Sequence, residues 1–307
     1  MARTTKYKMG KTEWFLLLTL SVLWGSSFIN LKNALSEIEP FTVVFLRITL
    51  AALGLLVWSL ITKKSFKLPL KQHIILFGMG MTMAAIPFIF FTWGQKYIST
   101  SMASIFNGGV PFFTAMFAHF LLGQSERLTV NKIIGLLVGF AGIVTMIGID
   151  AIENFDLTNL GQLSILTATF FYAISGIYNR LFISDDLDNI VLATYSLLWS
   201  SLVTGLISFS VEGVPTLNYS GSVWVSLLMI SLLSTALAYV LLFKIIKTAG
   251  ASNTSLTTFI IPIFAITLGT LFLGESFAPN EILGVILILV GLAFIQNLHK
   301  LLLKLIR

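Results

Sequence analysis

Residues 41–61 read FTVVFLRITLAALGLLVWSLI, and this stretch decides the class of protein. Its 21 residues carry a single charge, Arg47. A helix of that length rises about 31 Å, which matches the hydrocarbon thickness of a bilayer. The stretch therefore predicts a membrane-spanning helix. The composition extends this to the whole chain, because 56% of the residues are hydrophobic, only 10% are charged and the mean hydropathy is +0.94.

Nine further segments have the length and composition of spanning helices. The links between them are short, and the longest polar stretch runs from Thr62 to Gln72. The ten predicted spans are residues 13–33, 41–61, 73–93, 101–122, 132–149, 159–181, 189–210, 222–243, 252–273 and 281–299.

The basic residues are distributed unevenly between the two sides of the membrane, if the chain crosses it ten times. With a cytoplasmic N-terminus, the links on that side hold 16 of the 19 Lys and Arg residues, and the opposite links hold only Lys32 and Lys96. The positive-inside rule then predicts a multi-pass protein of the cell membrane with both termini cytoplasmic. The net charge of +6 reflects topology, so the sequence predicts no nucleic-acid partner. The 16 residues are Arg3, Lys6, Lys8, Lys11, Lys63, Lys64, Lys67, Lys71, Arg127, Lys132, Arg180, Lys244, Lys247, Lys300, Lys304 and Arg307.

The second half of the chain repeats the pattern of the first. Pro111 matches Pro262 at an offset of 151 residues, and Gly142 matches Gly291 at an offset of 149. Each half contains five spans, an odd number, so the second half must cross the membrane in the opposite sense. The sequence predicts an all-α membrane protein with about ten transmembrane helices in two inverted five-helix repeats, residues 1–151 and 152–307.

Several motifs point to one family. They are Trp24-Gly25-Ser26-Ser27-Phe28 followed by Lys32, Leu46-Arg47, Pro111, Leu121-Leu122-Gly123 with Glu126-Arg127-Leu128, and Phe272-Leu273-Gly274-Glu275. Together they resemble the EamA-type family of the drug/metabolite transporter superfamily, over essentially the whole chain. The resemblance implies ten helices, two inverted repeats and export of small metabolites, often amino acids. The sequence departs from that pattern where Gln124-Ser125 precede Glu126 and where Tyr195 occupies the position matching Arg47.

No group of residues with catalytic or cofactor-binding spacing is found in the sequence. His73, His119 and His299 lie on different predicted helices without metal-ligand spacing, and there is no Gly-Lys-Ser/Thr phosphate loop. The chain has no cysteine, which excludes disulfides and thiol chemistry. The sequence therefore predicts a protein that is not an enzyme and has no cofactor, with the lipid bilayer and a small-molecule substrate as its partners.

Arg47 is the strongest basic candidate inside the membrane. It follows Pro40 by seven residues, which places it about 10 Å inside the bilayer boundary. One interpretation is a carboxylate-binding or gating group, because a guanidinium at this depth needs a cavity or a partner. The other is an arginine that extends to the surface and pairs with Glu37 or Glu39.

The fourth predicted span is interrupted by Asn107-Gly108-Gly109-Val110-Pro111, and the matching stretch of the ninth is Thr258-Phe259-Ile260-Ile261-Pro262. Backbone groups freed from a helix are tolerated only beside protein or water. Paired interruptions in two halves indicate a transport site, although a proline kink without a function is the alternative.

Polar and aromatic side chains recur on matched helices at spacings that place each set on one face. An aromatic stripe can also serve for packing, but polar edges are costly when they face lipid. The candidate substrate-binding residues are Trp24, Ser27, Asn30, Arg47, Phe88, Phe91, Asn107, Tyr172, Ser175, Tyr178, Thr235, Tyr239 and Thr258.

Small residues form seams on the fifth and tenth predicted helices. Such seams allow helices to approach closely, so they indicate helix packing or a homodimer contact. The seam residues are Gly135, Gly139, Gly142, Gly284 and Gly291.

The predicted function is secondary transport, as an exporter of small metabolites such as neutral or aromatic amino acids, by alternating access around a central cavity. A passive channel or facilitator is the alternative, and it would need a continuous polar lining. A membrane-embedded enzyme would need paired acids or clustered histidines at membrane depth, which the sequence lacks.

The charge asymmetry generates a topology prediction. Reporter domains fused to either terminus should both report the cytoplasm, because an even number of crossings returns the chain to its starting side. Alkaline phosphatase and green fluorescent protein fusions measure this directly. An external location of either terminus would contradict the scheme.

Overall fold

Long apolar helices dominate the computed structural model, which describes residues 9–98, 100–148, 153, 156, 158–273 and 278–296. Seven of these helices are long and apolar enough to cross a membrane, and Ile105–Leu121 and Pro279–Ile295 are shorter apolar helices. The predicted all-helical fold with ten helices is confirmed for the described residues.

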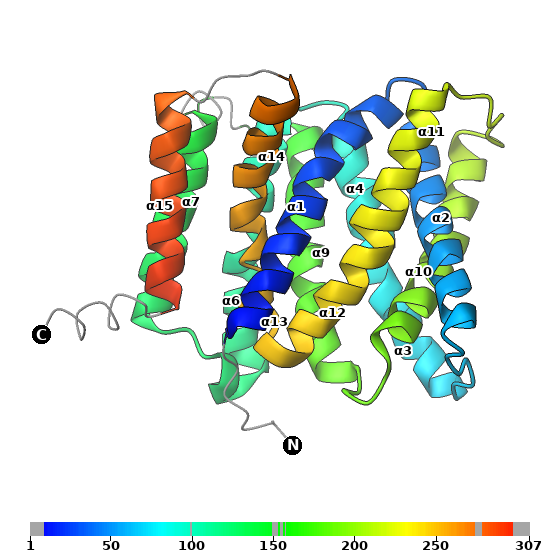
Figure 1. The fold of residues 1–307 in the computed structure, drawn as a ribbon, viewed down its shortest axis with the longest axis horizontal. Helices are drawn as coiled ribbons and strands as arrows, with labels where there is room; N and C mark the ends of the chain where they lie inside the picture. The colour runs from blue at the N-terminus through cyan, green and yellow to red at the C-terminus, as the bar shows by residue number, and fades with distance from the viewer. Residues whose placement is uncertain are drawn as a thin grey trace, which may run out of the picture.

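Some spans are single helices and others consist of consecutive pieces (Figure 1). The π-helices η1 and η3 lie within the third and eighth spans, and η2 is a 3₁₀ turn. In chain order the elements are α1 (Lys11–Ala34), α2 (Pro40–Ile61), α3 (Leu70–Gly80), η1 (Met81–Ala85), α4 (Ile86–Gly94), α5 (Thr100–Asn107), α6 (Val110–Leu121), η2 (Gly123–Glu126), α7 (Val130–Ile147), α9 (Leu160–Phe182), α10 (Asn189–Val211), α11 (Gly221–Leu228), η3 (Met229–Leu237), α12 (Ala238–Ala249), α13 (Ala251–Thr254), α14 (Thr257–Leu273) and α15 (Pro279–Ile295).

The predicted interruption of the fourth span is present, because α5 ends at Asn107 and α6 begins at Val110. The ninth span differs from the prediction. Pro262 lies inside α14, and the chain leaves the helical path earlier, between α13 and α14. The hydroxyls of Thr254 and Thr257 donate to the backbone there, and such bonds compete with the helical ladder.

The packing of the helices repeats between the two halves (Figure 1). In the first half α1 packs against α12 and α14, and in the second half its counterpart α9 packs against α4 and α6. Two helices contact their own counterparts, since α2 packs against α10 and α7 against α15. The two halves therefore interlock around a pseudo-two-fold axis, and the central space lies between them.

Glycines bring α7 and α15 into backbone contact. A Cβ atom built on Gly291 would lie 2.6 Å from the carbonyl oxygen of Gly135, and one on Gly284 would lie 2.7 Å from that of Gly142. No side chain fits at such distances, so the two seams predicted from the sequence pack against each other within one chain.

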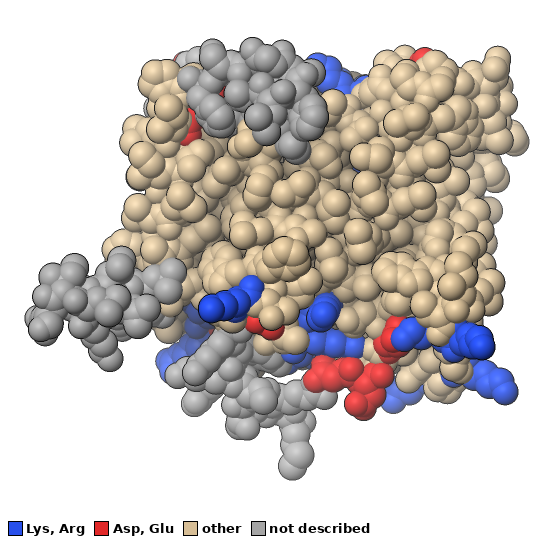
Figure 2. All heavy atoms as spheres, in the orientation of Figure 1, with Lys and Arg blue, Asp and Glu red and all other residues tan. Residues whose placement is uncertain are grey.

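Basic residues gather at the end of the bundle where α1 begins, and we call this the basic end (Figure 2). Lys32 and Lys96 lie at the opposite end. Arg3, Lys6, Lys8, Lys300, Lys304 and Arg307 lie outside the described residues, as do Gly274 and Glu275. The described residues of the basic end are Lys11, Lys63, Lys64, Lys67, Lys71, Arg127, Lys132, Arg180, Lys244 and Lys247.

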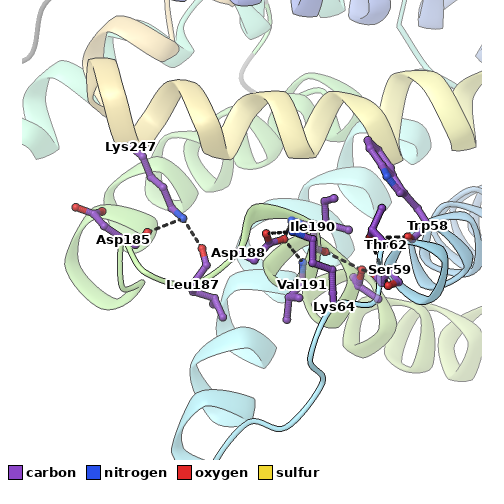
Figure 3. A network of polar contacts seen from close by, with 11 residues as sticks. Trp58, Ser59, Thr62, Lys64, Asp185, Leu187, Asp188, Ile190, Val191 and Lys247 are labelled. Atoms are coloured by element: carbon purple, nitrogen blue, oxygen red, sulfur yellow. Dashed lines mark hydrogen bonds and ion pairs between the residues drawn. The ribbon is translucent and has the colours of Figure 1, made fainter.

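Two lysines hold the link between α9 and α10 at the basic end, one from the segment after α2 and one from α12 (Figure 3). Lys64, after α2, pairs with Asp188 at 2.6 Å, and Lys247 of α12 donates to two carbonyl oxygens of the link. Asp188 also accepts the backbone N–H groups of Ile190 and Val191, which begin α10. Burial alone would raise the pKa of Asp188, but these hydrogen bonds outweigh burial and lower that pKa below its usual value.

The opposite end has matching contacts. Glu212, after α10, accepts the N–H groups of Phe41 at 3.0 Å and Thr42 at 2.7 Å, which are free at the start of α2. Lys96 pairs with Glu39 at 2.7 Å. The pair α2 and α10 is therefore tied by charged groups at both ends.

The glycine seam generates a stability prediction. Gly291→Ala should lower the free energy of unfolding by about 1–3 kcal/mol, because the new methyl group meets backbone that cannot yield. The melting temperature of the detergent-solubilised protein measures this. Gly221→Ala is the matched control, since no heavy atom lies within 4 Å of a Cβ there. Equal melting temperatures for both variants would contradict the backbone contact between α7 and α15.

Candidate functional site

One cavity lies where the two halves meet, and seven of the ten spans line it. Three repeat-matched pairs contribute: α1 with α9, η1 and α4 with α12, and α5 and α6 with α13 and α14. From the pair α2 and α10, only α2 contributes. The lining residues are Trp24, Ser27, Phe28, Leu31, Arg47, Met83, Phe88, Phe91, Thr92, Asn107, Val110, Thr114, Tyr172, Ser175, Gly176, Tyr239, Leu242, Ile246, Ala251, Thr254, Ser255, Thr258 and Ile261.

Most of the candidate residues from the sequence meet in this cavity. They come from seven spans, so the fold gathers positions that are far apart along the chain. The ten that line it are Trp24, Ser27, Arg47, Phe88, Phe91, Asn107, Tyr172, Ser175, Tyr239 and Thr258.

Three candidates lie outside the lining. The Asn30 amide turns back to donate to the carbonyl of Ser26, and the Tyr178 hydroxyl donates to the carbonyl of Ile75. Thr235 is fully buried and contacts the cavity only through Arg47. Helical spacing placed these residues on the right helices, but it could not show which hydroxyls and amides would bind the backbone instead.

Both π-helices hold aromatic side chains of the lining in place. The Trp24 indole N–H donates to the carbonyl of Ser234 in η3 at 3.0 Å, and the Tyr239 hydroxyl donates to the carbonyl of Met83 in η1 at 3.0 Å. An inserted residue in a helix disturbs the regular ladder and frees such carbonyls. Each aromatic side chain is therefore held by a carbonyl of the distorted segment of another span, and both side chains line the cavity.

Arg47 is buried, with 7% of its surface exposed. Its Nε donates to the Thr235 hydroxyl at 2.8 Å, and its Cζ lies 4.1 Å from the centre of the Phe88 ring. Glu37 and Glu39 are engaged elsewhere, by the Ser220 N–H and by Lys96. The surface pairing considered for Arg47 is therefore absent from the described residues, and the guanidinium faces the cavity.

Further polar groups of the lining are available to a ligand, among them the Thr92 and Thr114 hydroxyls. Among the described residues, neither the Asn107 amide nor the Tyr172 hydroxyl has a hydrogen-bond partner, and both residues border the cavity. No Asp or Glu lines it, and no cluster of metal-ligating side chains occurs in the described part of the chain. The site is thus an aromatic and apolar chamber with one positive charge.

Sequence reasoning missed the apolar and small residues of the lining. Phe28 and Leu31 follow Trp24 by four and seven positions, so helical periodicity could have identified them. Met83 and Ala251 gave no such signal, because one belongs to a π-helix and the other to the one-turn helix α13.

Duplicated halves around a central cavity form the architecture of secondary transporters. The sequence profile of the EamA-like transporter family matches residues 12–148 and again residues 159–296. The chain belongs to this family and is therefore a multi-pass membrane transporter and not an enzyme.

Curated relatives extend over nearly the whole chain. The uncharacterized transporter YoaV of Bacillus subtilis is 27% identical over 281 residues, which cover 90% of this chain and 94% of the relative. A protein of Escherichia coli described as a probable amino-acid metabolite efflux pump is 24% identical and covers 92% of this chain and 94% of its own length. One crystal structure shares the fold with a TM-score of 0.77 at 18% identity, covering 94% of this chain and 99% of the other.

Proposed function

We propose that the protein is a secondary transporter that exports small metabolites, such as neutral or aromatic amino acids, by alternating access. The observation that carries this proposal is the central cavity, which repeat-matched helices enclose. A pair of inverted halves can expose such a cavity to either face by exchanging conformations.

The chemistry of the lining supports an amphipathic solute. The rings of Phe88 and Phe91 lie 6.4 Å from that of Tyr172, forming an apolar wall, and Asn107 and Arg47 offer polar groups. Relatives from Escherichia coli and Salmonella typhimurium are described as probable amino-acid metabolite efflux pumps, which agrees with this solute class.

A passive channel or facilitator is the second candidate. The broken spans α5–α6 and α13–α14 beside the cavity would suit either mechanism. The sparse polar groups of the lining favour a carrier, because a permanently open pore for a polar solute needs a continuous polar path.

The remaining assignments follow from the proposed topology. The basic end would face the cytoplasm of a cell membrane, and residues 1–151 and 152–307 would form the two exchanging repeats. A homodimer stays a prediction, and it would use a surface other than the two glycine seams, which contact each other.

Transport by purified protein in proteoliposomes tests the proposal. Alanine at Trp24, Asn107, Tyr172 or Tyr239 should raise the apparent substrate constant about 10-fold or more for the amino acid that the wild type transports, since each loses a wall or a polar contact of the site. Trp58→Ala is the control, because Trp58 is a partly exposed aromatic residue of α2 outside the cavity.

Counterflow separates the two mechanisms. A carrier preloaded with unlabelled substrate transiently accumulates labelled substrate, whereas a channel only equilibrates it. Transport that is unaffected by the cavity variants, or a Trp58→Ala defect equal to theirs, would contradict the proposed site.

A further inference from the structure

The charge of the central cavity defines a narrower substrate class. Among the described residues, Arg47 is the only charged one of the lining, and none of the lining side chains is acidic. The buried Glu126 is not part of the lining, and its carboxylate accepts the N–H groups of Ala251 and Ser252. A single positive charge in an apolar chamber is costly, and a ligand with one negative charge would compensate it.

The contacts of Arg47 determine which part of it a ligand can reach. Thr235 takes the Nε–H, and the Phe88 ring covers one face of the guanidinium. The two terminal amino groups have no hydrogen-bond partner among the described residues. Their fixed fork matches the two oxygens of a carboxylate.

Thr235 fixes this orientation through the π-helix. Its hydroxyl donates to the carbonyl of Ile230, five residues earlier, so its lone pair points at Arg47. The five-residue separation of this hydrogen bond matches the spacing of the π-helix η3. The π-helix η3 therefore positions the hydroxyl that holds the Arg47 guanidinium.

The same cavity offers an ammonium group no oppositely charged partner among the described residues. The possible acceptors are all neutral: the Asn107 carbonyl oxygen and the hydroxyls of the lining, of which Tyr172, Thr92 and Thr114 have no hydrogen-bond partner among the described residues. A zwitterion beside Arg47 leaves a net charge of +1 in the chamber, whereas a monocarboxylate cancels it. The carboxylate is bound by complementary charge, and the ammonium is at best tolerated.

We propose that the site requires a carboxylate and does not require an amino group, so that monocarboxylates with an aromatic or branched apolar body are its best ligands. This inference rests on the proposed transport function and narrows its substrate class. Amino acids bind as carboxylates with an additional cost, and the corresponding amines bind more weakly than either.

Three compounds with the same phenyl body test the proposal: 3-phenylpropionate, phenylalanine and 2-phenylethylamine. Inhibition of substrate transport and ligand-induced thermal stabilisation of the purified wild type should rank them in that order. The amine should be at least about 10-fold weaker than the acid, as expected for loss of a charge-assisted pair.

Arg47 variants complete the test. Arg47→Gln should remove the preference for the acid over the amine, and Arg47→Lys should restore it only in part, because an ammonium lacks the fork. Amine binding equal to acid binding in the wild type overturns the inference, even if transport is intact. Absence of both transport and binding for all compounds overturns the proposed function as well.

A second inference comes from the floor of the cavity at the basic end. The one-turn helix α13 supplies Ala251 and Thr254 to the lining. It follows Gly250, whose φ of +84° breaks α12, and a second break separates it from α14. The floor is therefore a short segment between two breaks.

Glu126 holds this floor from the other repeat. Its carboxylate accepts the N–H groups of Ala251 at 3.0 Å and Ser252 at 2.7 Å, and it is only 3% exposed. Arg180 lies 3.8 Å from the same carboxylate. Two free N–H groups at a helix start bind a buried carboxylate strongly.

We infer that Glu126 is a latch that keeps the cavity closed at the basic end. Within the proposed alternating access, opening toward this end requires the carboxylate to leave α13. The latch should then control the exposure of the cavity, separately from the affinity of the site.

The chain contains no cysteine, so single introduced cysteines report exposure without background. Ser255→Cys, in the lining, should react with a membrane-impermeant thiol reagent at least about 10-fold faster from the basic side in the Glu126→Ala background than in wild type. Ser184→Cys, in the exposed link after α9, identifies that side in each vesicle preparation.

Asp186→Ala is the matched control, because it removes an exposed carboxylate at the same end that does not contact α13. Glu126→Gln, which keeps one acceptor oxygen, should give an intermediate rate and covers the case that Glu126→Ala does not fold. Unchanged reactivity of Ser255→Cys in both Glu126 variants overturns the latch, whereas failure of transport in the wild type overturns the proposed function.

Discussion

Inside a bilayer no water is available to the backbone, so every freed N–H or carbonyl must find a partner within the protein. This constraint explains where the irregular segments lie. The carbonyl of Phe106, at the break of the fourth span, accepts the Thr169 hydroxyl at 3.2 Å. The carbonyls of Met83 and Ser234 accept the side chains of Tyr239 and Trp24. The hydrogen bonds that satisfy the freed carbonyls thus also fix the aromatic side chains that line the cavity.

The central cavity is symmetric in its helices and asymmetric in its charge. Three matched pairs of spans contribute to the lining, but α2 contributes Arg47 and its counterpart α10 contributes nothing. Tyr195, the residue matched to Arg47, donates its hydroxyl to the carbonyl of Phe66 and packs edge-on against His73. The single charge of the cavity lining therefore lies at a position where the two repeats differ.

Much of this architecture could be predicted from the sequence, because the bilayer imposes strong patterns. Spanning lengths, glycine seams and the interruption at Gly108-Gly109 depend on local composition. Among the described residues, the structure has seven helices of spanning length, both seams and the interruption. The candidate cavity residues came from matching the two repeats. The π-helices were not predictable, because Met81–Ala85 has the composition of an ordinary apolar helix. The role of Thr235 was missed for the same reason, since a hydroxyl on a regular turn gives no sign that it will hold an arginine.

The break in the ninth span shows a further limit of sequence reasoning. Pro262 is the residue that composition marks as disruptive, yet it lies within α14. The chain breaks instead where threonine hydroxyls compete for backbone carbonyls, as at Thr254 and Thr257. Such competition depends on side-chain orientation, which is determined by neighbouring helices and is not visible in the order of residues.

The contact between α7 and α15 has a mechanical consequence. These helices are equivalent in the two repeats and pack directly on each other, as α2 and α10 do, so both pairs lie beside the pseudo-two-fold axis. Residues close to this axis move least when the two halves exchange their conformations. The backbones at Gly135 and Gly291 can therefore be in direct contact without hindering such a motion. In the proposed alternating access, the rigid seam would serve as the pivot, and the broken helices around the cavity would carry the movement.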